Sequence, residues 1–306
     1  MLAPICLFTY NRPSHTRRTV EALLANEGAE QTDLIIFSDH PKTSADDNLV
    51  EQVREYLKTI SGFHSVTICE RRINFGLAKS IISGVSETIQ NYGKAIVVED
   101  DILTSPYFLS FMNSALDVYE MDDRVISIHG YVYPTEVEFI TPFFLRGADC
   151  WGWATWKRGW QLFNPDGAQL HAQLNARKLF AEFDFNGAYP YGQMLKDQTL
   201  GRNNSWAVRW YASAFLADKL TLYPGRSLVH NIGNDGTGTH SKMDGRFATQ
   251  INRSAIELGE VTVTHSEVAY CAFSRFLGKL KQSRWRRFLA RMSGLAAMLR
   301  KVAKSL

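Results

Sequence analysis

The sequence predicts an α/β protein with a mostly parallel β-sheet flanked by helices, and two observations carry this prediction. Short apolar runs rich in β-branched residues alternate with segments whose apolar residues recur at helical spacing, and the links between them are short. The apolar run Ala95–Val98 then ends at three adjacent carboxylates, Glu99, Asp100 and Asp101. Because burying unpaired carboxylates is unfavourable, we expect them at the carboxyl end of a strand, where an open α/β sheet keeps its ligand crevice.

Strands and helices are expected to alternate strictly up to residue 101 and less regularly beyond it. The first part should contain, in order, a strand over Pro4–Tyr10, a helix over 17–26, a strand over Asp33–Phe37, a helix over Ser44–Ile60, a strand over Ser65–Cys69 and a helix over Ala78–Tyr92. The second part should contain a helix over Tyr107–Tyr119, a strand over Arg124–His129, a helix over Ser205–Ala217 and a strand over Leu220–Tyr223. No internal repeat or low-complexity linker divides the chain.

The charge of the chain is divided between an acidic body and a basic end. The net charge of the 306 residues is +3, yet residues 268–306 hold ten basic residues and no Asp or Glu, which leaves 24 basic against 31 acidic residues in 1–267. We therefore expect a folded domain over 1–267 and a separate tail over 268–306. A nucleic-acid binder would carry its positive charge on the folded face, so this pattern disfavours that class.

The tail has the pattern of a basic amphipathic helix from Leu280 onward, with apolar residues near helical spacing and Arg or Lys between them. Such a helix can lie in the interface of an anionic membrane and gain about 1 kcal/mol per basic residue; packing on the acidic body is the alternative. The four cysteines form no C-x-x-C pair, and there is no signal-peptide pattern or long apolar run. We expect a cytoplasmic protein, peripheral on the inner face of the membrane.

The three carboxylates are suited to a hard divalent cation that keeps several waters and bridges to phosphate oxygens. Strand alternation predicts that Glu99 and Asp101 share a side while Asp100 turns away. The alternative is an acidic turn followed by a helix N-cap. A position directly after a buried strand favours the metal site.

Polar residues after the other strands point to a nucleotide at the same edge. Thr9, Asn11 and Arg12 follow the first strand and Asp39 follows the second. Arg12 could contact a phosphate or a base, and Asp39 could accept from a base N–H or a ribose hydroxyl, while capping or turn roles are the alternatives. The chain has no G-x-G-x-x-G or G-x-x-x-x-G-K-[ST] loop, so a diphosphate would be neutralised by the metal, with help from Arg72 or Lys79.

Two later segments could complete a sugar site. In the tryptophan-rich stretch 143–160, Trp151 and Trp153 could stack on a sugar ring and Gly152 could let a ligand approach the backbone, or all could be core or lid residues. His240 ends a glycine-rich run and could cap a metal; it is preferred to His230, which follows an apolar pair.

Several motifs occur together in an order that resembles the glycosyltransferases of the GT-A fold, in particular N-acetylglucosaminyltransferase I and related bacterial sugar transferases. They are R-P-S-H-T-R-R-T-V-E-A-L-L, V-V-E-D-D-I-L-T-S-P-Y-F-L-S-F, D-D-R-V-I-S-I-H-G, F-F-L-R-G-A-D-C-W-G-W and T-L-Y-P-G-R-S-L-V-H-N-I-G-N-D-G-T-G-T-H, and they span residues 1 to about 245. The resemblance implies a GT-A-like, Rossmann-like catalytic domain over 1–267.

The resemblance also implies roles for individual residues. Asp101 and His240 would hold Mn²⁺ or Mg²⁺, and Glu99 and Asp100 would hold the ribose and the donor sugar. Arg12 and Asp39 would bind the base, with Thr9, Asn11, Asn74 and Lys79 completing the nucleotide-sugar site.

One departure from that family concerns the catalytic base. Where the family has a W-D-D-W-like segment, this chain has S-W-A-V-R-W, and Ala207 and Val208 cannot accept a proton. Asp197 is the expected substitute, and Asp149 is the second candidate.

The sequence therefore predicts a metal-dependent inverting glycosyltransferase, hexosyl or N-acetylhexosaminyl, that moves a sugar from a UDP-linked donor to a glycan or lipid-linked saccharide. A nucleotidyltransferase with the same kind of sheet is one alternative, although F-T-Y-N-R-P is not the basic glycine-rich loop it needs. A catalytically inactive carbohydrate-binding or membrane-associated protein is the other, because the W-D-D-W base is missing.

Overall fold

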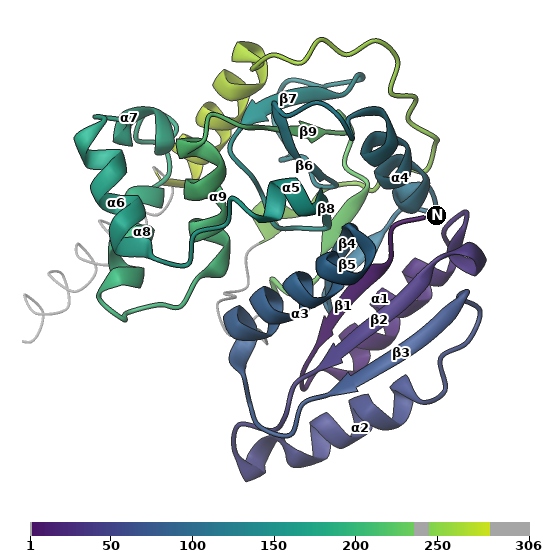
Figure 1. Ribbon diagram of the computed structural model, residues 1–306. Coiled ribbons are helices and arrows are strands. Elements are labelled where there is room, and N and C mark those ends of the chain that lie inside the picture. Colours follow the sequence, from purple (N-terminus) through teal and green to yellow (C-terminus); the bar gives the residue numbers. More distant parts are fainter. Residues whose placement is uncertain (1, 236–244, 282–306) are drawn as a thin grey trace, which may run out of the picture.

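A computed structural model describes residues 2–235 and 245–281, and its centre is an eight-stranded sheet (Figure 1). The strands lie in the order β3-β2-β1-β4-β8-β6-β9-β7, and β8 and β7 run antiparallel to the other six. Their bounds are β1 Ile5–Thr9, β2 Asp33–Ser38, β3 Ser65–Glu70, β4 Lys94–Glu99, β6 Val125–His129, β7 Phe143–Arg146, β8 Trp153–Trp156 and β9 Leu220–Tyr223. The predicted fold class, a mostly parallel sheet flanked by helices, is confirmed.

Helices cover both faces of this sheet (Figure 1). They are α1 Pro13–Leu24, α2 Asp47–Leu57, α3 Gly76–Tyr92, α4 Phe108–Val118, α5 Lys157–Trp160, α6 Gly167–Ala176, α7 Phe180–Phe183, α8 Tyr191–Thr199 and α9 Trp206–Leu216, with short 3₁₀ turns at Ala29–Gln31, Ser44–Asp46 and Gly245–Phe247. In β1, Ile5 and Leu7 pack in the cluster of α1, α2 and α4, whereas Cys6 and Phe8 pack in that of α3 and α9. A strand buried on both faces explains the unbroken apolar run.

The strands that sequence periodicity missed lie after residue 101. β7 and β8 fall inside the tryptophan-rich stretch, where apolar residues are too dense for a strand to be distinguished from a helix. A separate two-stranded ribbon pairs β5, Ile102–Thr104, with β10, Val229–Asn231. This ribbon brings a late segment of the chain next to the end of β4.

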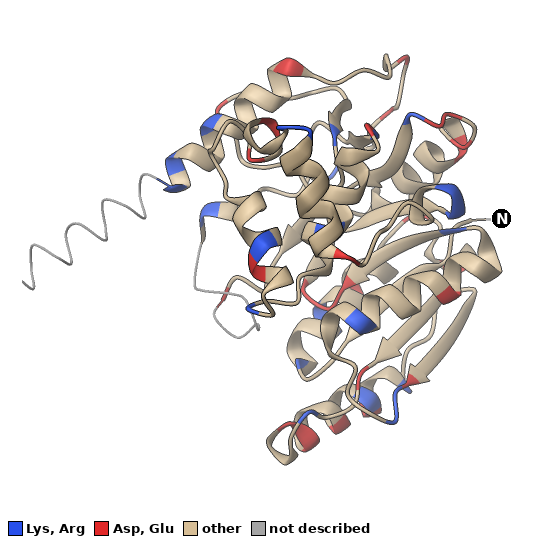
Figure 2. Ribbon diagram, turned by 60° about the vertical axis from the view of Figure 1, so that its left-hand side comes forward, with Lys and Arg blue, Asp and Glu red and all other residues tan. Residues whose placement is uncertain are grey.

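The start of the predicted tail belongs to the folded body. Residues 267–281 are helical, and Ala269, Phe273 and Leu277 are fully or almost fully buried in a cluster with β7 and α6 to α9. The predicted domain boundary at 267 therefore falls at the start of a packed helix. Figure 2 shows blue, basic positions on this helix. The rest of the predicted amphipathic helix, 282–306, lies outside the described residues.

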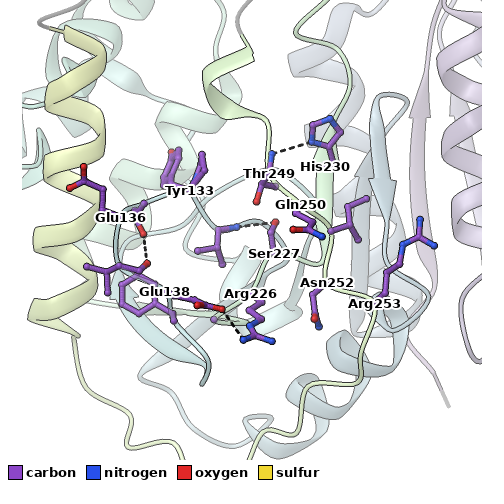
Figure 3. A pocket seen from close by; sticks show the side chains of 17 residues that line it. Tyr133, Glu136, Glu138, Arg226, Ser227, His230, Thr249, Gln250, Asn252 and Arg253 are labelled. Atoms are coloured by element: carbon purple, nitrogen blue, oxygen red, sulfur yellow. Dashed lines mark hydrogen bonds and ion pairs between the residues drawn. The ribbon is translucent and has the colours of Figure 1, made fainter.

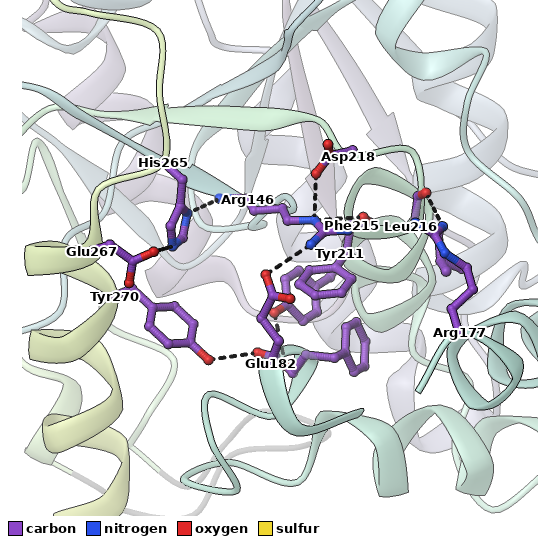
Figure 4. A network of polar contacts seen from close by, with 11 residues as sticks. Arg146, Arg177, Glu182, Tyr211, Phe215, Leu216, Asp218, His265, Glu267 and Tyr270 are labelled. Atoms are coloured by element: carbon purple, nitrogen blue, oxygen red, sulfur yellow. Dashed lines mark hydrogen bonds and ion pairs between the residues drawn. The ribbon is translucent and has the colours of Figure 1, made fainter. Parts of the chain in front are cut away.

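Arg146 on β7 connects several segments of the chain after residue 101 (Figure 4). Its guanidinium bridges Glu182 at 2.9 Å and Asp218 at 3.0 Å, and it lies 4.1 Å from the centre of the Phe215 ring. Its backbone N–H donates to Nδ1 of His265 at 3.1 Å.

Within the described ranges, no helix combines the length and the apolar character needed to cross a membrane.

Candidate active site

The candidate site lies at one edge of the sheet. β1, β2, β4 and β6 run in the same direction, so their carboxyl ends at Thr9, Ser38, Glu99 and His129 meet there. β8 runs the other way and begins at this edge with Trp153. Most residues singled out in the sequence follow these strand ends.

The acidic turn, Glu99–Asp101, is bound by Arg12. β4 ends at Glu99, and Asp100 and Asp101 form a turn. Nη2 of Arg12 donates to Oδ1 of Asp100 and, at 2.9 Å, to Oδ2 of Asp101. The prediction that Asp100 turns away from Asp101 is wrong, because strand alternation stops with the strand and the turn presents both carboxylates to one guanidinium.

The acidic turn concentrates negative charge where solvation is poor. Desolvation raises the pKa of Glu99, and repulsion from Asp101 and Asp100 raises it further. Desolvation also raises the pKa of Asp100, although the Arg12 guanidinium opposes this shift. One guanidinium faces three carboxylates, so the site would be stabilised by an additional cation.

The chain after β10 closes over the acidic turn. Asn231 pairs with Ile102 in the β5–β10 ribbon, and the N–H of Ile232 donates to the carbonyl of Asp101 at 2.8 Å. A Cβ on the next residue, Gly233, would lie 2.1 Å from Oδ2 of Asp101 and 3.0 Å from Nη1 of Arg12. Glycine is therefore needed for this close approach of backbone to carboxylate.

Asp39 holds the start of α3. Oδ1 accepts from the N–H of His40 at 2.9 Å and of Phe75 at 2.8 Å. Oδ2 accepts from the N–H of Gly76 at 2.8 Å and from Nδ2 of Asn74 at 3.3 Å. The carboxylate is buried and makes four hydrogen bonds, so Asp39 fixes the conformation of the loop that was expected to bind the nucleotide. Asn74 also fixes this loop, because its Nδ2 donates to the carbonyl of His40.

Three other predicted nucleotide residues lie around the same edge. Thr9 is 4% exposed, and its Oγ1 has no hydrogen-bond partner among the described residues. Nδ2 of Asn11 donates to Oδ1 of Asp46 at 2.8 Å. Nζ of Lys79 lies 4.0 Å from the centre of the Phe75 ring on an exposed part of α3. An orphaned buried hydroxyl at a strand end calls for a ligand or water partner.

The second base candidate, Asp149, lies beside His129 and near the acidic turn. Its Oδ1 accepts from the N–H of Cys150 at 2.8 Å and is 3.9 Å from Nε2 of His129. That nitrogen accepts from the N–H of Trp151 at 3.1 Å, so neutral His129 carries its proton on Nδ1. Burial raises the pKa of Cys150, and the nearby charges of Asp149, Glu99 and Asp101 raise it further.

The first base candidate, Asp197, has a different setting. It lies on α8, where Oδ1 accepts from Gln193 at 3.0 Å and pairs with Arg202 at 3.1 Å. No hydrogen bond or ion pair joins it to the acidic turn within the described part of the chain. His240, the predicted metal ligand, lies outside the described residues.

The tryptophan-rich stretch contains both buried core residues and a partly exposed residue at the edge of the candidate site. Trp153 has no exposed surface and packs against Trp160, Trp206 and Trp210 with ring centres 5.6 to 5.7 Å apart. The prediction that Trp153 contacts a sugar is therefore wrong, because its ring is buried in the core. Trp151 is partly exposed, and its ring makes a T-shaped contact with the ring of Tyr131, with the ring centres 4.7 Å apart.

Gly152 makes a tight crossing of chains. Its φ is +64°, and an added Cβ would lie 3.0 Å from Cγ1 of Val229. Its carbonyl accepts from the N–H of Gly130 at 2.7 Å. The side chain of Val229 lies against this glycine, where a ligand was expected to approach the backbone, so the glycine serves the packing of β10.

Sequence reasoning missed a set of polar aromatic residues around Asp149. The pKa values of Tyr131 and Tyr133 are raised by burial and, next, by neighbouring charges that include Asp149. The hydroxyl of Tyr133 lies 3.5 Å from that of Tyr191 on α8. Scattered tyrosines have no spacing that would have identified them, although His129 could have been noticed as a polar residue at a strand end.

The donor atoms of the acidic turn fit a hard divalent cation. Carboxylate oxygens are the protein ligands that Mg²⁺ and Mn²⁺ prefer. In residues 2–235 and 245–281, no three His, Cys, Asp or Glu side chains are grouped as metal ligands. An ion held by Asp101 would therefore take most of its ligands from phosphate oxygens and water, as Mg²⁺ commonly does.

Residues 5–132 match the family model of glycosyl transferase family 2. The matched range starts with β1 and runs to the loop after β6, and it contains Arg12, Asp39 and the acidic turn. The match confirms the predicted resemblance to glycosyltransferases of the GT-A fold and supports a glycosyltransferase. No curated protein sequence matches the chain.

Solved structures that match part of the chain include S. aureus TarS 1–349, with 9% identity and a TM-score of 0.36 over 58% of this chain and 50% of that one. The mannosyltransferase PcManGT from Pyrobaculum calidifontis, in complex with GDP-Man and Mn²⁺, has 11% identity and a TM-score of 0.40 over 71% and 68%. A UDP-glucose pyrophosphorylase complexed with UDP-glucose has 13% identity and a TM-score of 0.35 over 72% and 90%. The chain thus spans half the length of the TarS chain.

Proposed function

We propose that the protein is a metal-dependent inverting glycosyltransferase that transfers a hexose or N-acetylhexosamine from a UDP-linked donor to a glycan or lipid-linked saccharide. The acidic turn at the carboxyl end of β4 is the observation that carries the proposal. It combines carboxylate ligands with Arg12 inside the range that matches glycosyl transferase family 2.

The donor half of the mechanism rests on the residues around the acidic turn. A bound Mn²⁺ or Mg²⁺ would supply Lewis-acid stabilisation of the departing diphosphate. Asp101 would hold the ion, with His240 as its second protein ligand, and Arg12 could exchange Asp101 for a phosphate oxygen, since a guanidinium binds both groups well. Asp100 and Glu99 would contact the ribose and sugar hydroxyls, and Thr9 Oγ1, Asn11 and Lys79 would line the nucleotide edge.

The acceptor half needs a carboxylate that takes the proton of the attacking hydroxyl. Asp149 is better supported for this role than Asp197, because the next residue, Cys150, is close enough to Glu99 and Asp101 to feel their charges, and the side chain of Asp149 is 23% exposed. The N–H of Cys150 orients its carboxylate. Trp151, on the exposed side, would contact the acceptor or the transferred sugar.

The cellular setting is part of the same proposal. A cytoplasmic enzyme at the inner face of a membrane would meet lipid-linked acceptors, and the ten basic residues of 268–306 would attract anionic lipid. The support for this part is the charge pattern of the sequence.

The test of the donor is a thermal-shift series with UDP-, GDP- and CDP-sugars, each with and without Mn²⁺. A ligand that binds only the folded state raises the melting temperature, and we expect this with a UDP-sugar only when Mn²⁺ is present. Asp101→Ala should abolish both the shift and donor hydrolysis, whereas Glu51→Ala, an exposed carboxylate on α2, should change neither.

Two results would contradict the proposal. Full transfer and hydrolysis by Asp101→Ala in saturating Mn²⁺ would exclude the acidic turn as the metal site. Donor binding without turnover on any acceptor would instead favour an inactive carbohydrate-binding protein.

A further inference from the structure

Figure 3 shows a cavity, whose volume is about 720 Å³. It opens past the carboxyl ends of β6 and β9, at the edge of the sheet that also holds the acidic turn. Its walls come from residues 132–139 after β6, residues 225–227 after β9, His230 on β10 and residues 249–253. Its volume is within the range of roughly 300–1,000 Å³ typical of small-molecule sites. None of the residues assigned to the donor lines it.

The sheet places this cavity beside the acidic turn and outside it. β6 and β9 are the second and third strands from β4, and neighbouring strands are about 4.8 Å apart, so their ends lie roughly 10 and 14 Å from the end of β4. His230 pairs with Leu103 in the β5–β10 ribbon, and the second residue after it, Ile232, donates to the carbonyl of Asp101. One wall of the cavity is thus continuous with the backbone over the acidic turn.

The opposite wall leads toward the proposed base. Tyr133 lines the cavity, and its hydroxyl meets that of Tyr191 at 3.5 Å. Tyr131, two residues earlier, contacts Trp151 and donates from its hydroxyl to the carbonyl of Phe247 at 2.8 Å. A ligand in the cavity would therefore approach both the leaving-group side and the base side of the candidate site.

The charges of the lining are largely balanced. Arg226 pairs with Glu138 at 2.8 Å, and Glu136 pairs with Lys279. Arg253 has no hydrogen bond or ion pair with the described residues and adds one positive charge. A nucleoside diphosphate would need more positive charge than this. A lipid chain would cover the Arg226–Glu138 pair without forming hydrogen bonds to it, which is unfavourable.

The remaining polar groups suit a ligand rich in hydroxyls. Among the described residues, the side-chain amide of Gln250 has no partner, and it offers both donors and an acceptor. Nδ1 of His230 accepts from the N–H of Thr249 at 3.4 Å, which leaves Nε2 to donate (Figure 3). The Arg226–Glu138 pair, with side chains 50% and 74% exposed, adds charged donors and acceptors at the surface.

We propose that this cavity binds the non-reacting part of the acceptor saccharide, with Gln250, His230 and the Arg226–Glu138 pair as hydrogen-bond partners of its hydroxyl groups. The inference rests on the proposed glycosyltransferase activity and specifies the side from which the acceptor enters. It makes these residues determinants of acceptor specificity and leaves donor binding to the acidic turn.

The test uses the full chain saturated with UDP and Mg²⁺ and the neutral disaccharides of glucose, galactose, mannose and N-acetylglucosamine as probes. Saturation-transfer NMR should identify at least one disaccharide that binds, and a titration should give its dissociation constant. We expect Arg226→Met and Gln250→Ala each to weaken that binding about tenfold or more, which is about 1.4 kcal/mol. UDP affinity should stay unchanged.

The matched controls are Arg124→Met and Gln52→Ala. Arg124 is also a surface arginine in an ion pair, with Asp122, but it lies at the opposite edge of the sheet, before β6. Gln52 is exposed on α2. Both control variants should bind the disaccharide as the wild type does.

Three outcomes separate the possibilities. If both cavity variants bind the disaccharide as tightly as the wild type, the cavity is not the acceptor site. If UDP binds but none of these disaccharides does, the saccharide assignment is overturned while the donor site stands. If UDP itself fails to bind with metal, the proposed function fails.

Discussion

At the scale of single residues, the same chemical group serves different ends at neighbouring strand ends. In the acidic turn, Asp100 and Asp101 share the guanidinium of Arg12. Asp39 instead accepts four hydrogen bonds, one from the N–H of His40 and three from residues 74–76 at the start of α3. A carboxylate whose lone pairs all accept hydrogen bonds from the protein has a structural role, and one with unused lone pairs is available to a ligand. This difference identifies Asp101 as the better candidate for metal binding.

Gly233 offers a test of the acidic turn that removes no ligand. In Gly233→Ala, the new Cβ would lie 2.1 Å from Oδ2 of Asp101 and would displace that carboxylate. We expect metal-dependent UDP binding to weaken at least tenfold, measured by calorimetric titration with Mn²⁺, whereas the melting temperature changes little. Gly245→Ala, whose Cβ would meet nothing within 4 Å, is the control. Unchanged UDP binding by Gly233→Ala would separate Asp101 from the metal.

The buried imidazole of His129 should make stability depend on pH. Burial lowers its pKa below the ordinary 6.5, although Asp149 opposes this shift. Because the folded pKa is below the unfolded one, unfolding takes up a proton between the two values, and the free energy of unfolding falls as the pH drops from about 6.5 through the folded pKa. A tenfold difference between the folded and unfolded proton affinities of the imidazole corresponds to about 1.4 kcal/mol of stability.

Urea unfolding between pH 5 and 7.5 measures this effect. We expect the wild type to lose more stability at the acidic end than His129→Gln does, since glutamine fills a similar space without titrating. Equal pH dependence in the two proteins would show that His129 does not contribute to it.

At the scale of elements, two tryptophans two positions apart have opposite environments. β8 begins at Trp153, whose ring packs against Trp206 and Trp210 of α9, while Trp151 precedes the strand at the rim. The strand therefore connects a core aromatic cluster to the candidate site.

Alanine substitutions should separate these environments. Removing a buried aromatic ring costs about 3–5 kcal/mol, so Trp153→Ala should lower the free energy of unfolding by that amount in urea titrations. Trp151→Ala should cost much less and should weaken disaccharide binding in the NMR titration. The assignment of Trp151 to the acceptor side would be lost if its replacement left that binding unchanged.

At the scale of the whole molecule, the first hundred residues were predictable because each strand there is an isolated apolar run followed by polar residues. The expected strand Ser65–Cys69 and helix Ala78–Tyr92 differ from β3 and α3 by one or two residues. The part after residue 101 was less predictable, since β7, β8 and the β5–β10 ribbon depend on pairing between distant segments. The location of the acidic turn followed from local pattern, whereas its contact with Arg12 required the fold.

The first part of the C-terminal region, residues 268–281, is basic and also packs in the core. All ten charged residues of 268–306 are basic, yet Ala269, Phe273 and Leu277 in the same segment are core residues next to β7. A chain ending at 267 loses these side chains, each worth about 1.5–3 kcal/mol when large and fully buried, and should lose cooperative unfolding. A chain ending at 281 keeps them and should unfold cooperatively in urea.

The two truncated chains also test membrane binding. In co-sedimentation with vesicles, the chain ending at 281 lacks seven of the ten basic residues and should bind phosphatidylserine vesicles much more weakly than the full chain does. Vesicles of phosphatidylcholine alone, which carry no net charge, should bind both chains equally weakly. If the chain ending at 281 binds anionic vesicles as strongly as the full chain, the membrane role of 282–306 is wrong, and the acidic body must be examined as the partner of those basic residues.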